Sequence, residues 1–355
     1  SALAVMPNGD LIAGGSFRSP AVPTSSAVAR WTGTTWEGIG TLNGTVYALA
    51  IMPNGDIVAG GYFYSANGGQ NVGNVARWNG TRWMPLGSGI NDGVFALASL
   101  PNGDLIAAGN FVSAGGVECN RVARWDGVRW SPLGSGLGPI GVASSSYALF
   151  ALAAPSNGGL FAAGRSDRFV NRGTVSRWDG AAWSRVGQDL PGDVLDLTVS
   201  PSGDIFAGIL RSPTSYTSDG VFYWDGVRWS VVGGGVSSSV SSTWGWCACG
   251  IALSPEGDLL VGGAFNLAGT APTKNVALFN SPCRCLADLD NDGDLGNGLT
   301  RDGAVTIEDL LSFLVGFEAG NVLVDLDNGT TTGTPDNAVD INDLLFFLAR
   351  FEAGC

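Results

Sequence analysis

The sequence contains no histidine and few charged residues. Histidine is the usual general base near neutral pH and the commonest metal ligand, so its absence excludes Ser-His-Asp and Cys-His mechanisms. A zinc site would need cysteine or carboxylate ligands alone. Charged residues make up only 14% of the 355. No apolar run approaches the roughly 20 residues of a membrane-spanning helix, so we expect no membrane span.

The negative charge is concentrated near the carboxyl end. Residues 1–282 hold 17 acidic and 15 basic side chains, whereas residues 283–355 hold 14 acidic and 3 basic ones, and the whole chain carries a net charge of −13. No basic stripe is present that could neutralise phosphates, so nucleic acid is not expected as a partner. The chain instead divides into a nearly neutral part and an acidic tail.

What the sequence does have is glycine and tryptophan. It contains 55 glycines and 12 tryptophans, and 45% of its residues are hydrophobic. Glycine at this level is far above its usual share of about 7%, and the apolar content argues against disorder. Many tight turns with few charges favour an all-β fold.

Cysteine is present in even number. The six residues stand at positions 119, 247, 249, 283, 285 and 355. An even count in a chain poor in lysine suits an oxidising compartment; the alternative is a set of unpaired buried thiols. The sequence opens inside a repeat, at "SALAVMPNGD". We therefore expect a trimmed start that lacks an export signal.

A unit of about fifty residues repeats along residues 1–282. Its first marker, "PNGD" or a variant, begins at Pro7, Pro53, Pro101, Pro155, Pro201 and Pro255. Its second marker is W-x-G-x-x-W, as in Trp78 and Trp83, and in the sixth unit it has decayed to "ALFNSP". Such a period indicates a repeat architecture.

Each unit predicts four short strands. In the second unit these are 46–52, 56–63, 74–79 and 81–87, because "NG" and "DG" are strong two-residue hairpin signals. In that hairpin Trp78 would face Thr81, which places Trp83 on the diagonal of the same face. The paired tryptophans are interpreted as a packing staple between neighbouring sheets. A sugar-stacking role is the alternative.

Repeated four-stranded sheets predict a mostly β fold, a six-bladed β-propeller. The sixth unit lacks a fourth strand, which a strand from the missing N-terminal part could supply. A seventh blade upstream and a β-solenoid remain as alternatives. The "GG-x-F … ARW-x-G-x-x-W-x-x-LG" unit resembles kelch-type propellers and, more closely, those of bacterial secreted proteins and fungal cortical polarity markers. The copper site of kelch-type oxidases needs histidines and does not carry over.

A propeller ligand would be expected on one face. The "PNGD" and "WDG" turns share a uniform face, whereas the loops on the other face vary, and binding usually lives on irregular loops of a rigid scaffold. Asp196 replaces an alanine on a first strand, where it could hold an ion or a sugar hydroxyl, or meet water in the central channel. Trp244 and Trp246 could form an aromatic platform for carbohydrate, or could cover a loop.

Arginines recur beside the second marker. Arg77 lies opposite Arg82, and Arg124 opposite Arg129, in the two-residue hairpins predicted here. Like charges directly across a strand pair are unfavourable, so these arginines are expected to pair with "PNGD" aspartates such as Asp56. An anion site is the alternative.

The acidic tail, residues 283–355, holds one pattern twice. Stripped of insertions, both copies read D-x-D-x-D-[GN]-A-V-x-I-x-D, which is the spacing of a calcium loop with oxygen ligands at positions 1, 3, 5, 7, 9 and 12. The first loop's ligands would be Asp288, Asp290, Asp302, the Ala304 carbonyl, Thr306 and Asp309, with Asp292 as an alternative to Asp302. The second loop's ligands would be Asp325, Asp327, Asp336, the Ala338 carbonyl, Asp340 and Asp343.

Each loop runs into a short amphipathic helix. The apolar faces would be Leu310 to Phe317 and Leu344 to Phe351. Helices this short are marginal alone, and about ten carboxylates would repel one another without metal, so folding of this small domain is expected to depend on two calcium ions.

The tandem loop-helix pair resembles a dockerin domain, and the closing "FEAGC" resembles the GC-type dockerin-like module that ends large exported bacterial proteins. The resemblance covers about 284–355 and implies a cohesin-like or cell-surface scaffold partner, although the loop insertions depart from cellulosomal dockerins. A Cys285–Cys355 disulfide would tie the module's ends together; covalent attachment through Cys355 is the alternative. Cys283 could pair with Cys247 or Cys249.

Three function hypotheses follow. The first is a secreted or cell-surface, non-enzymatic protein whose propeller is a rigid display or binding body and whose tail is a calcium-dependent anchoring module; carbohydrate is the candidate ligand of the propeller's loop face. The second is a tethered enzyme that acts on polysaccharide, which would need a pair of carboxylates. The weak candidates are Asp193, Asp196, Asp189 and Asp167. A purely structural envelope protein is a third interpretation.

Overall fold

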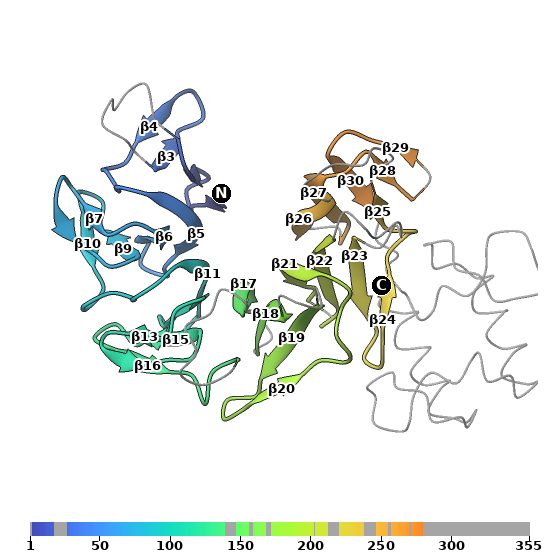
Figure 1. Ribbon diagram of the computed structural model, residues 1–355. Coiled ribbons are helices and arrows are strands. Elements are labelled where there is room, and N and C mark those ends of the chain that lie inside the picture. The colour runs from blue at the N-terminus through green and yellow to red at the C-terminus, as the bar shows by residue number, and fades with distance from the viewer. Residues whose placement is uncertain are drawn as a thin grey trace, which may run out of the picture. The chain divides into compact units, whose positions relative to one another are not determined.

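The computed structural model describes residues 2–17, 27–138, 147–155, 159–167, 172–201, 203–211, 220–237, 246–254, 257–269 and 271–279. The chain divides into two compact units. The first comprises Ser1–Ile251 and Gly262–Val276, and the second comprises Ala252–Val261 and Ala277–Cys355. All regular elements of the described residues are β-strands (Figure 1). The predicted calcium loops, their helices and Cys283, Cys285 and Cys355 lie outside these residues. Among the described residues, no helix is long and apolar enough to cross a membrane.

Four sequence units each form a four-stranded antiparallel sheet in chain order, and the strands of the fifth and sixth units belong to one seven-stranded sheet, in which β22 pairs with β26. The first holds β1 (Ala2–Val5), β2 (Leu11–Gly14), β3 (Val28–Trp31) and β4 (Trp36–Gly38). The second holds β5 (Thr45–Ile51), β6 (Ile57–Tyr62), β9 (Val75–Trp78) and β10 (Trp83–Pro85). The third holds β11 (Val94–Ser99), β12 (Leu105–Gly109), β15 (Val122–Trp125) and β16 (Trp130–Pro132).

The next two units repeat the same strand order. The fourth holds β17 (Ala148–Ala153), β18 (Leu160–Asp167), β19 (Arg172–Trp178) and β20 (Trp183–Arg185). The fifth holds β21 (Asp193–Val199), β22 (Ile205–Arg211), β23 (Val221–Trp224) and β24 (Trp229–Val231). The sixth unit contributes β26 (Trp246–Leu253), β27 (Leu259–Ala264) and β30 (Val276–Phe279). The four-strand unit and the propeller-like fold are confirmed, and the number of blades stays a prediction.

Six two-residue strands lie in the loops between the main strands. They are β7 (Ser65–Ala66), β8 (Gln70–Asn71), β13 (Ser113–Ala114), β14 (Val117–Glu118), β28 (Leu267–Ala268) and β29 (Ala271–Pro272). A further strand, β25 (Val236–Ser237), pairs with β28. The first two pairs are small hairpins in the connection between the second and third strands of their sheets, on the face opposite the "PNGD" turns.

The tryptophan hairpin differs from the prediction. Trp78 pairs directly with Trp83, so the loop has four residues rather than two and the tryptophans are not diagonal. The side chain of Asn79 causes this, because its Oδ1 accepts the backbone N–H groups of Thr81 and Arg82 at 3.1 and 3.0 Å. An Asx turn of this kind replaces the predicted two-residue turn. Arg82 therefore lies in the loop and not opposite Arg77.

The hydrophobic core lies between neighbouring sheets. One cluster joins Val75 and Leu86 of the second sheet to Leu105 and Trp125 of the third. Similar clusters join the first sheet to the second, the third to the fourth and the fourth to the fifth. The sheets approach closely, because a Cβ added at Gly60 would lie 2.5 Å from Val94 Cγ1. Face-to-face packing of consecutive small sheets is the packing of a propeller.

Candidate functional site

The first strand of four consecutive sheets is interrupted at the same place. The pairing register shifts between Val46 and Ala48 in β5, and at the equivalent point of β11, β17 and β21. A β-bulge leaves one residue unpaired and re-aims its side chain, and bulges of this kind recur beside functional sites. The residues at these bulges are Tyr47, Phe95, Phe150 and Leu195.

The three aromatic bulge residues form a continuous row. Strands β5, β11 and β17 lie next to one another (Figure 1). The ring centroids of Tyr47 and Phe95 are 5.6 Å apart, and those of Phe95 and Phe150 are also 5.6 Å apart. Tyr62, the last residue of β6, closes a triangle with centroids 5.9 Å from Tyr47 and 5.7 Å from Phe95. We call Tyr47, Tyr62, Phe95 and Phe150 the aromatic row.

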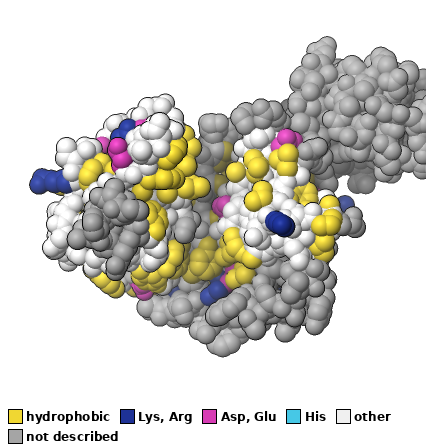
Figure 2. Space-filling model, turned by 90° about the horizontal axis from the view of Figure 1, so that it is seen from above, with side chains coloured by type: hydrophobic (Ala, Val, Ile, Leu, Met, Phe, Trp, Pro, Cys, Tyr) yellow, Lys and Arg dark blue, Asp and Glu magenta, His cyan; other side chains and the backbone are white. Residues whose placement is uncertain are grey.

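The aromatic row is open to solvent in part. Tyr47 is 38% exposed and Tyr62 is 36% exposed, and Phe95 and Phe150 are half-buried. Hydrophobic side chains, drawn in yellow, gather in bands on the face shown in Figure 2. Rings that stay partly exposed on a rigid scaffold are unusual in a core, and they can stack on the apolar faces of a ligand.

Polar groups border the second-sheet end of the row. Asn110 Nδ2 donates a hydrogen bond to the Tyr62 hydroxyl at 2.8 Å. Burial raises the pKa of Tyr62; the Asn110 bond opposes this, and the nearby Asp92 carboxylate adds to it. The Tyr62 hydroxyl is therefore neutral; it accepts a hydrogen bond from the Asn110 amide and lies near the Asp92 carboxylate.

An ion pair borders the other end. The Arg165 guanidinium lies over the Phe150 ring, 5.5 Å from its centroid, and Arg165 Nε donates to Asp193 Oδ2 at 2.8 Å. Asp193 is 3% exposed, and its hydrogen bond raises the pKa of Arg165. Arg165 and Tyr62 occupy equivalent positions in their sheets, since each pairs just before the bulge of its own first strand.

Two buried oxygens beside the row have no hydrogen-bond partner among the described residues. They are Asn110 Oδ1 and Asp193 Oδ1. A buried acceptor that is left without a donor costs about 1–3 kcal/mol. Native structures usually explain such atoms by a ligand, an ion or a water molecule.

Asp196 acts as a clamp between strands. Its Oδ2 accepts the N–H of Ile251 in β26 at 2.8 Å, and its Oδ1 accepts the N–H of Leu197 at 2.9 Å. The carboxyl is half-buried, and this burial raises its pKa although both hydrogen bonds oppose the rise. The sequence placed Asp196 correctly on a first strand, where its register matches that of Ala48. Its two partners give it a structural role in joining β21 to β26.

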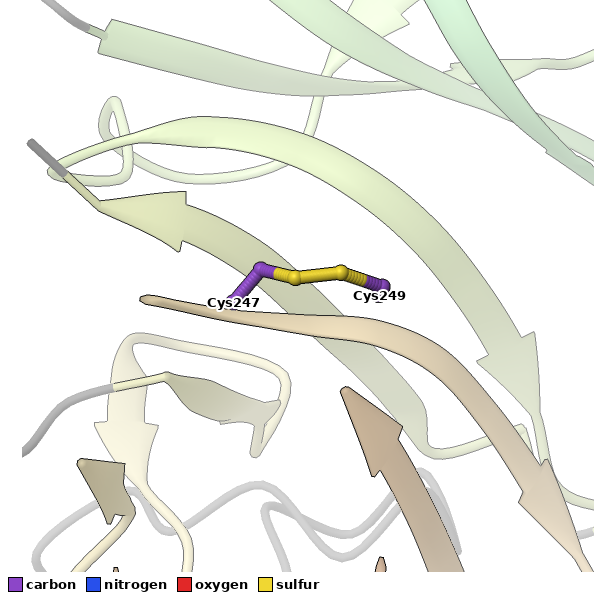
Figure 3. The surroundings of a disulfide bond; sticks show 2 residues. All are labelled: Cys247 and Cys249. Atoms are coloured by element: carbon purple, nitrogen blue, oxygen red, sulfur yellow. A yellow bond between two sulfur atoms is a disulfide. The ribbon is translucent and has the colours of Figure 1, made fainter. Parts of the chain in front are cut away.

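The second predicted platform is only partly described. Trp244 lies outside the described residues, and of Trp246 only the backbone, at the start of β26, is described. Cys247 and Cys249, on the same strand, are joined by a disulfide (Figure 3). This corrects the prediction that one of them pairs with Cys283, because two residues on one strand already lie within bonding reach. Cys119 is a buried free thiol, and its burial raises its pKa.

The tryptophan pairs are confirmed as a packing staple. Their ring centroids lie 5.4–5.5 Å apart. The second tryptophan donates its indole N–H to a carbonyl of the preceding sheet, as Trp130 does to Leu86 at 2.9 Å. The same bond recurs for Trp83, Trp183 and Trp229. These indoles therefore pack between sheets, and their N–H groups are already hydrogen-bonded.

The hairpin face is held by ion pairs, as expected. Arg77 Nε lies 2.9 Å from Asp56 Oδ2, and Arg124 Nε lies 2.7 Å from Asp104 Oδ2. A shallow pocket of about 240 Å³ opens beside Arg77 and Asp56, with Trp125 in its wall. It is smaller than the roughly 300–1,000 Å³ of ordinary ligand pockets.

Three of the four carboxylates named for an enzyme have other partners. Asp193 pairs with Arg165, and Asp189 pairs with Arg185. Asp196 accepts two backbone N–H groups, and the side chain of Asp167 is not described. Among the described residues, no three of cysteine, aspartate or glutamate cluster as metal ligands. The predicted ligands of the two calcium loops lie outside these residues.

Sequence reasoning missed the aromatic row, although a signal was present. The first strands read "VYALA", "VFALA" and "LFALA", with one aromatic at the same place in three successive units. Alternation alone assigns that residue to the exposed side of a strand. The bulge that brings the three rings into contact is not visible in the residues themselves.

Comparison with known proteins supports the propeller. A family model described as "Domain of unknown function (DUF5122) beta-propeller" matches residues 53–80 and 100–125, in the second and third units. These segments run from the "PNGD" turn into the tryptophan strand. The chain thus contains a β-propeller domain. No curated protein matches the sequence.

Several solved structures are similar to this chain at low sequence identity. The extracellular domain of BT4673 from B. thetaiotaomicron is 10% identical with a TM-score of 0.41, over 79% of this chain and 38% of that one. YCF48 bound to D1 peptide is 12% identical with a TM-score of 0.44, over 78% of this chain and 80% of that one. Streptogramin B lyase is 12% identical with a TM-score of 0.45, over 78% of each chain. The chain therefore spans less than two fifths of the BT4673 domain.

Proposed function

We propose that this chain is a secreted or cell-surface, non-enzymatic binding protein of bacterial type. Its β-propeller holds a ligand, and residues 283–355 anchor it through a calcium-dependent dockerin-like module. The observation that carries the binding role is the aromatic row, whose half-exposed rings stand on rigid strands between a neutral amide and an ion pair. Rigid scaffolds that present a few irregular side chains commonly bind ligands.

The anchoring role rests on the duplicated acidic pattern. Two loops of oxygen-bearing residues at calcium-loop spacing, each followed by an apolar helix, favour two calcium ions over a merely acidic surface. Calcium neutralises the loop carboxylates and so lets the two helices pack. The partner would be a cohesin-like or other surface scaffold protein.

A polysaccharide-cleaving enzyme is the second candidate. It needs one carboxyl group as acid and another as base or nucleophile. Asp193 and Asp189 are ion-paired with arginines, and Asp196 has both oxygens on backbone N–H groups. These partners favour binding without cleavage, and release of reducing ends from a bound glycan would be the mark of an enzyme.

Calorimetric titration of the full chain with calcium tests the anchoring proposal. We expect two ions per chain, together with a gain of helical circular dichroism. Asp325→Asn and Asp288→Asn should each lose one ion, because each removes the first ligand of one loop. Asp56→Asn, a propeller aspartate paired with Arg77, is the matched control and should bind two ions. A chain that binds no calcium, or an Asp325→Asn chain that still binds two, rejects the proposal.

A further inference from the structure

We propose that the aromatic row is a binding site for a neutral oligosaccharide. This inference rests on the proposed binding role of the propeller and names its ligand class. It involves only the propeller, so it stands or falls separately from the calcium-dependent module.

The first argument is the availability of the rings. In the tryptophan staple, the indole N–H groups are bonded and the second ring of a pair is mostly buried; Trp130 is 3% exposed. In the aromatic row, Tyr47 and Tyr62 keep more than a third of their surface exposed. Sugars stack their C–H faces on such rings, since an aromatic face carries partial negative charge.

The second argument is periodicity. Successive sheets place one bulge ring each, at equal centroid spacings of 5.6 Å along Tyr47, Phe95 and Phe150; Tyr47 and Phe95 meet edge to face at 78°, and Phe95 and Phe150 are tilted by 33°. A ligand with repeating units can place successive units against successive rings. A repeating site thus favours an oligosaccharide over a single small molecule.

The third argument is polar complementarity. Sugar hydroxyl groups both donate and accept hydrogen bonds. Asn110 Oδ1 and Asp193 Oδ1 are acceptors without a donor among the described residues, one near each end of the row. Both are closed to bulk water, so a hydroxyl group would satisfy them only by inserting between the row and these side chains. A hydrogen bond to a buried acceptor that lacks a donor contributes more binding free energy than a hydrogen bond to an exposed acceptor.

The fourth argument is charge. Among the described residues, the charged side chains that border the row are Asp92, Arg165 and Asp193, and Arg165 is already paired with Asp193. One negative charge is left beside Tyr62. The site therefore disfavours acidic polysaccharides and leaves a neutral glycan as the matching class.

The test is binding of the full chain to an array of neutral and uronic-acid oligosaccharides, followed by calorimetry on the neutral glycan that binds best. We expect neutral glycans to bind and galacturonic acid oligomers to be at least tenfold weaker. Phe95→Ala and Tyr47→Ala should each weaken binding at least tenfold. Phe95→Tyr should restore it to within threefold, because it keeps the ring.

Two further variants separate the row from the rest of the molecule. Asn110→Ala removes the amide that faces Tyr62 and should weaken binding by tenfold or more. Trp36→Ala alters another exposed ring, 44% exposed in the first sheet, and should leave affinity unchanged. Thermal unfolding of each variant shows that it is folded before affinities are compared.

Repeating the titration in excess EDTA distinguishes the two proposals. Glycan binding that persists in EDTA supports the row whatever the fate of the calcium module. The inference is overturned if no neutral glycan binds, if Phe95→Ala binds as well as the wild type, or if a peptide or an acidic glycan is the ligand that depends on Tyr47 and Phe95.

Discussion

The protein has two repeated sets of aromatic residues, which differ in how much of their ring surface is exposed and available to a ligand. The tryptophan staple, five pairs along the second marker, lies between sheets with its inner indoles hydrogen-bonded to the preceding sheet. The aromatic row lies at bulges, with two tyrosines more than a third exposed. Repetition along a sequence therefore does not by itself separate structural aromatics from binding ones. The local backbone, a regular hairpin or a bulge, separates them.

The largest effect of a single substitution is expected in the tryptophan staple. Trp130→Ala should lower the free energy of unfolding by about 3–5 kcal/mol, as for other large buried aromatics, because Trp130 is 3% exposed and bonds Leu86. Denaturant unfolding measures the loss, with Trp36→Ala, at 44% exposed, as the matched control. Equal losses at the two positions would contradict the staple role of the buried ring.

In the aromatic row we expect the opposite: a small loss of stability and a large loss of glycan binding. Phe95→Ala should cost only about 1–2 kcal/mol of stability, since it removes half-buried ring contacts, yet it should abolish most glycan binding. Unfolding and affinity measured on the same preparation check the two effects together. A loss of stability as large as that of Trp130→Ala would make Phe95 a core residue instead.

The hairpin face offers a smaller test of its structural role. Asp104→Ala removes a carboxylate that pairs with Arg124 and accepts the Asn102 amide, and it should cost about 1 kcal/mol; the Arg124 side chain is 43% exposed, whereas that of Asp104 is only 9% exposed. The loss should shrink in high salt. Glycan affinity should not change, and a change would place ligand contacts on the hairpin face.

The smallest effect is expected at Asp196, as a pH dependence of the free energy of unfolding. Its folded-state pKa is raised by burial, so the folded chain binds more protons than the unfolded chain between the two pKa values. Stability from this group is therefore full at low pH and falls as pH rises from about 4, the ordinary aspartate value, through the raised pKa. The difference in unfolding free energy between wild type and Asp196→Ala should shift against the wild type over that range. A difference that is flat with pH contradicts the raised pKa.

How far the sequence predicts this molecule depends on how local each cause is. The "PNGD" and tryptophan markers give the strands of the second unit to within about two residues, because turns and alternation act over a few neighbours. The pairing of Arg77 with Asp56 was also predictable, since both stand near the same turns. The hairpin register was not, because Asn79 captures two amides and lengthens the loop.

The aromatic row illustrates the other limit. Its rings come from sheets whose first strands are about fifty residues apart, and their contact depends on bulges that shift each register by one residue. Neither the sheet packing nor the bulge is encoded by a local motif. Asp196 could be placed on its strand from the sequence, but its bond to Ile251 depends on tertiary structure.

Hydroxyl-radical footprinting of the full chain, with and without a neutral glycan, tests most directly whether the exposed bulge rings are the binding surface. We expect oxidation of Tyr47, Tyr62 and Phe95 to fall at least threefold with glycan, while Trp36 in the staple reacts as before. Unchanged oxidation of these three rings together with protection of Trp36 would contradict the division between a binding row and a structural staple.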